Sequence, residues 1–208
     1  MPSHDDLLFR AQLLTGFHAL LCLSEMVFSD KKAVHNYQKI SLWHSVQLLA
    51  HQYSFFLPHH KGDHTFDGNT ILIQKIATST DPYSPFQDYL QPRDSLFPLH
   101  PKLWLTSLRH VPTHHWFIKH QQTFFPKSYT GHSLRSGGAT SLAECFHHSG
   151  CWMVELLLLP DFHSEAPCCA TCTHLWASSP PTCPLAFSYF SFPLIAELTS
   201  HISSPHFT

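Results

Sequence analysis

The stretch GHSLRSGGATSLAEC, residues 131–145, predicts a helix that carries two candidate functional side chains on one face. His132 and Arg135 are three positions apart, so a helix places them side by side. The pair Gly137-Gly138 costs a helix about 1 kcal/mol per glycine relative to alanine. A helix tolerates that cost where another helix or a phosphate backbone approaches closely. Because an H-x-x-R pair alone is commonly a surface pair, the glycines are what favour a functional interpretation.

The residues before this helix predict two kinds of secondary structure. Residues 6–27 have apolar side chains at helical spacing, which indicates one buried helix or two packed helical segments. Residues 38–49, 52–58 and 69–76 are rich in β-branched or aromatic side chains, and turn-forming residues separate the last two. We expect these three segments to form a small antiparallel sheet.

The middle of the chain is rich in proline. Between residues 79 and 110 the prolines recur so often that we expect only short helical pieces. Thr113 is placed to cap a helix over residues 114–125, which a proline then ends. We therefore predict an α+β domain over residues 1–148, mainly α-helical with a small three-stranded antiparallel sheet.

Composition gives little sign of a nucleic-acid partner. Only 12% of the 208 residues are charged, against a usual share of about 25%. The formal net charge is −2, with 20 histidines against 12 lysines and arginines together. No apolar run approaches the length of about 20 residues that a membrane span needs. The cysteine count of 7 is odd and the first residues are acidic, so we expect an intracellular protein without membrane contact.

Three segments together resemble a known family. GHSLRSGGATSLAE resembles the H-x-x-R helix of the tyrosine recombinases, the phage-integrase-like enzymes that break and rejoin DNA, especially those of fungal mobile elements. LLTGFHALLCLSEMVFSD, residues 13–30, is similar to the first catalytic helix of that family, in which an arginine precedes a glutamate by three residues. SFFLPHHKGDHTFDGNTILI, residues 54–73, is similar to its β-hairpin with a catalytic lysine. The resemblance covers roughly residues 6–148 in the family's order.

The resemblance implies phosphoryl transfer on double-stranded DNA without a cofactor, in the nucleus. A tyrosine attacks the scissile phosphate, two arginines hold its oxygens, and a lysine protonates the leaving oxygen. Position by position, His132 and Arg135 match the motif pair and Lys61 matches the hairpin lysine. Glu25 matches the helix glutamate, whose role is structural.

The chain departs from this pattern at two positions. Cys22 stands where the family has its first arginine, and a thiol has no fixed positive charge. No tyrosine lies between Tyr129 and Tyr189, and Tyr189 is too distant to match the nucleophile. We therefore expect a catalytically defective copy that binds duplex DNA weakly through a remnant phosphate cluster of Lys61, His132 and Arg135, in an oligomeric state that the sequence does not define.

The C-terminal residues differ in character from the rest. Residues 149–208 have no sustained period and are rich in Pro, Ser and Cys, so we predict a disordered tail. Read one nucleotide forward, residues 163–175 permit I-R-K-H-P-V-V-L-H-A-L-I, which resembles the family's sequence after the nucleophile. We hypothesise that the tail is an out-of-frame translation of a decayed element. The KHQQ of residues 119–122 is interpreted as a former basic stripe, because mutation of arginine codons readily yields His and Gln.

A metal site in the tail is the alternative from another functional class. Cys169 and Cys172 form a C-x-x-C pair, and His174 and Cys183 follow. A structural zinc site needs a second pair of ligands at suitable spacing from the first. A single cysteine after a proline-rich gap does not provide such a pair well. On this hypothesis the chain is a small intracellular metal-binding or interaction protein.

Overall fold

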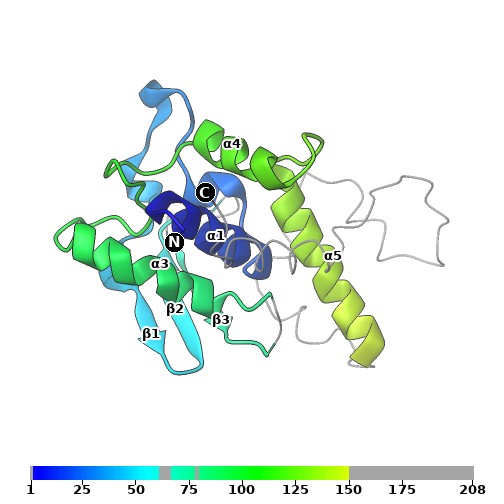
Figure 1. Cartoon of the computed structure of the whole chain (residues 1–208). Coiled ribbons are helices and arrows are strands. Elements are labelled where there is room, and N and C mark those ends of the chain that lie inside the picture. The colour runs from blue at the N-terminus through cyan, green and yellow to red at the C-terminus, as the bar shows by residue number, and fades with distance from the viewer. Residues whose placement is uncertain (1, 61–66, 78–79, 150–208) are drawn as a thin grey trace.

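The computed structural model of the chain describes residues 2–60, 67–77 and 80–149 (Figure 1). In chain order the helices are α1 (His4–His18), α2 (Leu23–Met26), α3 (Tyr83–Leu96), α4 (His114–Phe124) and α5 (Gly131–Ser149). The strands are β1 (Gln47–Leu49), β2 (Gln52–Leu57) and β3 (Asn69–Gln74). Short 3-10 helices η1 (Lys32–Val34), η2 (Tyr37–Lys39) and η3 (Trp43–Ser45) lie between α2 and β1. The predicted tail lies outside the described residues from position 150 onward.

Helix α1 lies at the centre of the fold. Every residue from Ala11 to Phe17 is buried, so the helix is covered around most of its circumference. It contacts α3 on one side and α5 on the other (Figure 1). Of the two arrangements expected for residues 6–27, the structure has the pair of helical segments, because the chain turns at Leu20 between α1 and α2.

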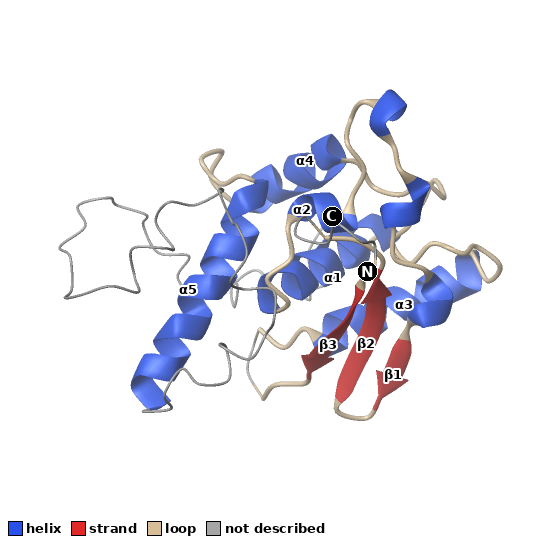
Figure 2. Cartoon of the chain, turned by 180° about the vertical axis from the view of Figure 1, so that it is seen from behind, coloured by secondary structure: helices blue, strands red, loops and turns tan. Residues whose placement is uncertain are grey.

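The predicted sheet is confirmed as a three-stranded antiparallel sheet in the order β1-β2-β3 (Figure 2). The described chain is thus a mixed α and β fold. Tyr53 on β2 joins three elements. Its ring stacks on Phe86 of α3 with centroids 4.0 Å apart, and its hydroxyl lies 2.8 Å from Thr15 Oγ1 of α1. This contact fixes the sheet against the central helix.

The first predicted strand is much shorter in the structure. Only Gln47–Leu49 of the segment 38–49 pairs with β2. The preceding residues form 3-10 turns, which the Ser45 hydroxyl stabilises by donating to the Leu42 carbonyl at 2.7 Å. The same oxygen accepts the Phe56 N–H at 3.1 Å, which holds the turn against β2. The hydrogen bonds of Ser45 thus stabilise the turn that immediately precedes β1.

The expectation of only short helical pieces between residues 79 and 110 is wrong, because α3 runs for 14 residues. Pro85 lies in the first turn, where the missing N–H needs no acceptor. Pro92 lies inside the helix and removes one internal hydrogen bond. The helix continues past it for four more residues, and the next residue, Arg93, is fixed by tertiary contacts.

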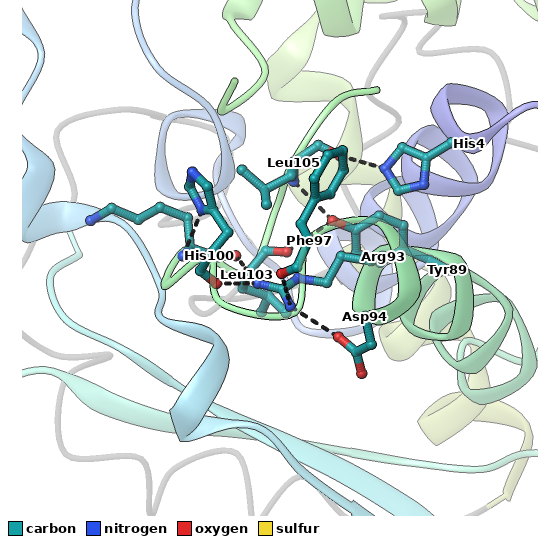
Figure 3. A network of polar contacts seen from close by, with 9 residues as sticks. His4, Tyr89, Arg93, Asp94, Phe97, His100, Leu103 and Leu105 are labelled. Carbon is teal, nitrogen blue, oxygen red and sulfur yellow. Dashed lines mark hydrogen bonds and ion pairs between the residues drawn. The ribbon is translucent and has the colours of Figure 1, made fainter. Parts of the chain in front are cut away.

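Arg93 joins the end of α3 to the loop that follows it (Figure 3). Its side chain is fully buried, and Nη2 donates to the carbonyls of His100 at 2.5 Å and Lys102 at 2.7 Å. Nη1 forms an ion pair with Asp94 at 2.9 Å, and the guanidinium lies 4.8 Å from the Trp43 ring centroid. A buried cation is tolerated only when it is paired in this way. Arg93 is therefore a structural residue.

Helix α4 begins where the sequence predicts it. The Thr113 hydroxyl accepts the Trp116 N–H at 3.3 Å and caps the helix. Gln121, within the segment 119–122, is fully buried. Among the described residues, neither Oε1 nor Nε2 of Gln121 has a hydrogen-bond partner. Gln122 beside it is exposed.

We predict that Gln121→Met stabilises the protein, because methionine fills a similar volume without a buried unpaired amide. An unsatisfied buried polar group costs about 1–3 kcal/mol, and the free energy of unfolding is expected to rise by a comparable amount. Urea unfolding of both proteins measures the change. Gln122→Met is the matched control and is expected to stay within about 0.5 kcal/mol of the parent. Equal effects of the two substitutions would contradict the burial of Gln121.

Candidate functional site

A tight turn after α1 positions Cys22. Leu20 adopts a left-handed conformation with φ of 55°, and the Leu21 N–H donates to the Gly16 carbonyl at 2.9 Å. A left-handed residue of this kind commonly closes a helix C-terminus. The chain then reverses, and Cys22 becomes the residue immediately before α2.

Glu25 fixes the backbone of Cys22. Its Oε2 accepts the Cys22 N–H at 2.7 Å, and the Glu25 side chain is 9% exposed. The carboxylate thus satisfies a main-chain donor at the start of α2, which would otherwise have no partner inside the helix. Glu25 here stabilises the local backbone.

Helix α5 approaches the first two helices very closely. A Cβ atom at Gly138 would overlap the carbonyl oxygen of Phe17, and one at Gly131 would lie 2.8 Å from Leu23 Cδ2. Leu134, between these glycines, is fully buried. The sequence left two reasons open for the glycines, another helix or a phosphate backbone. At Gly131 and Gly138 the structure shows that the neighbours are α2 and α1.

This packing brings Arg135 against Cys22. Arg135 Nη1 lies 3.1 Å from Cys22 Sγ, although the two residues are 113 positions apart in the sequence. Arg135 is exposed and Cys22 is partly buried. His132 is also exposed and lies one turn before Arg135 on the same face of α5. The structure therefore brings Arg135 of the H-x-x-R pair into contact with the position of the expected first arginine.

His114 adjoins this junction and was missed by the sequence interpretation. Its Nε2 would lie 3.5 Å from a Cβ atom at Gly131, the first residue of α5. The His114 N–H donates to the Phe28 carbonyl at 2.8 Å, which fixes the start of α4 beside the α2 segment. The sequence signalled only the helix cap at Thr113. The contact between the first turns of α4 and α5 has no sequence signature.

Several predicted site residues lie outside the described residues. Lys61 is in the connection between β2 and β3, which are paired as a hairpin as expected. The tail positions are also outside: Cys169, Cys172, His174, Cys183 and Tyr189. Within residues 2–60, 67–77 and 80–149, no group of three or more His, Cys, Asp or Glu side chains is placed to hold a metal ion. In the same ranges, no helix combines the length and the apolar character required to cross a bilayer.

The Arg135 guanidinium gives the junction a group that can bind an anion. A guanidinium offers two parallel N–H donors to a phosphate, and it stays charged at any physiological pH. A thiol beside it adds no fixed charge. Burial raises the pKa of Tyr53 and Tyr89, so neither hydroxyl is disposed to ionise as a nucleophile.

The chain matches no protein-family model, no curated protein and no solved structure. A functional conclusion therefore depends on the motifs and on the side chains that the fold brings together.

We predict that Gly138→Ala destabilises the protein by about 1–3 kcal/mol, because the added methyl group forces α5 away from the Phe17 carbonyl. This loss outweighs the higher helix propensity of alanine, which is about 1 kcal/mol. Thermal and urea unfolding measure the change. Ser136→Ala, at an exposed position of the same helix, is the control and is expected to have little effect. A Gly138→Ala protein as stable as the parent would contradict the close helix contact.

Proposed function

We propose that the chain is a DNA-binding domain of the tyrosine-recombinase type that holds a backbone phosphate of duplex DNA and does not cleave it. The observation that carries this proposal is the contact between Arg135 and Cys22, with Nη1 and Sγ 3.1 Å apart. In the family that the motifs resemble, these two positions hold the same phosphate. A phosphate site of this kind requires the two positions to be close in space. Here they are close although they are 113 positions apart in the sequence.

The accessibility of the site supports binding to a large, rigid anion. Arg135 and His132 are exposed on one face of α5, so a duplex can reach them without a rearrangement of the fold. Arg135 supplies a charged donor pair with the geometry of a phosphate. His132 supplies a ring nitrogen one turn away. Recognition of this kind is independent of DNA sequence, because it reads the backbone and not the bases.

The loss of cleavage follows from two missing groups. Cys22 removes one of two charges that stabilise the transition state, and loss of one such donor typically costs a factor of about 10²–10³ in rate. A tyrosine at the expected distance after the H-x-x-R motif is also missing, since none occurs between Tyr129 and Tyr189. Without a nucleophile the covalent pathway is closed. Binding needs neither group.

We predict that Cys22→Arg strengthens phosphate binding. The new guanidinium would lie beside Arg135, and two cations at this spacing repel unless an anion lies between them. The melting temperature of the variant is therefore expected to rise steeply with added inorganic phosphate, and that of the parent only slightly. On a duplex, one more phosphate contact is expected to raise the slope of log K against log salt concentration by about 0.9.

Cys22→Ser is the matched control, because it changes the thiol without adding charge and is expected to bind duplex DNA like the parent. Arg135→Gln is expected to lower the salt slope by about 0.9. A parent protein without salt-dependent duplex binding would refute the proposed function. A nicked suicide-substrate duplex tests cleavage separately, and we expect no covalent adduct. An adduct that disappears in Tyr189→Phe would show that cleavage is retained.

A further inference from the structure

The charges of the chain are segregated along the sequence. No aspartate or glutamate occurs between Asp30 and Asp63, whereas the whole chain has a formal net charge of −2. Lys31, Lys32 and Lys39 fall inside this stretch. Phosphate backbones are bound by such local concentrations of positive charge, even when the net charge of the protein is slightly negative.

These lysines lie on a loop that projects from the body of the protein (Figures 1 and 2). We call residues 31–39, which include η1 and η2, the basic arm. Lys31 and Lys32 are exposed and Lys39 is partly exposed. Tyr37 is 63% exposed, so this side chain, like those of Lys31 and Lys32, faces solvent.

The arm is held in a defined conformation by contacts of residues 35–38. His35 stacks on Phe28 with ring centroids 4.2 Å apart. Lys102 Nζ donates to the Tyr37 carbonyl at 3.1 Å and lies 5.7 Å from the centroid of that ring. The Asn36 side chain accepts the Gln38 N–H at 2.9 Å and caps η2. An ordered arm loses less entropy when a partner binds to it.

The nearest carboxylate along the chain does not cancel the charge of the arm. Asp30 Oδ1 accepts the His115 N–H of α4 at 2.8 Å. This hydrogen bond lowers the pKa of Asp30, so the carboxylate stays ionised. It contributes one negative charge at the base of the arm, against the three lysines of the arm and Lys102 beside Tyr37.

Contacts connect the base of the arm to the candidate site. Phe28, just before the arm, accepts the His114 N–H, and Asp30 accepts that of His115. His114 in turn lies beside Gly131, which begins the helix that bears Arg135. The base of the arm and the start of α5 therefore adjoin the same turn of α4.

We propose that the basic arm is a second contact to the phosphate backbone of duplex DNA, through Lys31, Lys32 and Lys39. The choice of DNA as the ligand rests on the proposed function of the Arg135 junction. A protein partner is less suited to the arm, because stable protein interfaces have an apolar centre and the arm offers little apolar surface beyond Val34 and Tyr37. Lysines bind phosphate as point charges and need no shaped pocket.

Fluorescence anisotropy of the full chain with a labelled 30-base-pair duplex, titrated over a range of KCl concentrations, tests the arm. The arm variant K31Q/K32Q/K39Q is expected to lower the slope of log K against log salt by about 2.7, from about 0.9 for each contact. The control K75Q/K119Q/K127Q removes the same charge from exposed lysines elsewhere and is expected to keep the parent slope. Arg135→Gln reports on the junction alone.

The outcomes separate the two proposals. If the arm variant keeps the parent slope while Arg135→Gln lowers it, the arm does not contact DNA and the proposed function stands. If the arm variant lowers the slope and Arg135→Gln does not, the arm binds DNA and the proposed function of the junction fails. Equal losses in the arm and control variants indicate diffuse attraction and overturn the arm proposal. A parent that binds no duplex overturns both.

Discussion

The fold depends on the approach of α5 to the end of α1. Gly138 lies so close to the Phe17 carbonyl that no side chain fits between the two backbones. Because interiors are packed without spare volume, this distance also determines how deeply Leu134 is buried and where the next residue, Arg135, can reach. The exposed guanidinium meets Cys22 as a result of a backbone contact about one helical turn further along α5. A constraint in the core thus sets the geometry of a surface site.

The few charges of the chain are divided between two uses. Arg93 is buried and donates to main-chain carbonyls, and burial lowers the pKa of Arg10, which is attracted to Asp88. These arginines serve the core. The positive charge of the surface comes from lysines and from the exposed Arg109 and Arg135. Within residues 31–60 the sequence contains no aspartate or glutamate. A chain with a net charge of −2 can therefore still present a positive face, which the total charge conceals.

Local signals in the sequence predicted local structure well. Hydrogen bonds between close neighbours, such as the cap at Thr113, depend on a few residues, so the start of α4 was predictable. The length of α3 was not, because tertiary contacts support the helix beyond Pro92. For the site, the motifs pointed to Cys22 and Arg135 but gave no distance, which only the helix packing determines. His114 was unpredictable because its position depends on how two helices meet.

The site and the fold respond differently to change at position 22. The conformation there is set by the left-handed Leu20 and by Glu25, which binds the main-chain N–H of Cys22. Neither of these two interactions involves the thiol, although the Cys22 side chain also takes part in the capping box at the start of α2, as an acceptor from the backbone of Glu25. The charge of the site can therefore be lost while its geometry persists beside Arg135. On the proposed function, a guanidinium restored at this position would strengthen phosphate binding, whereas strand cleavage would also require a nucleophile that no backbone constraint can supply.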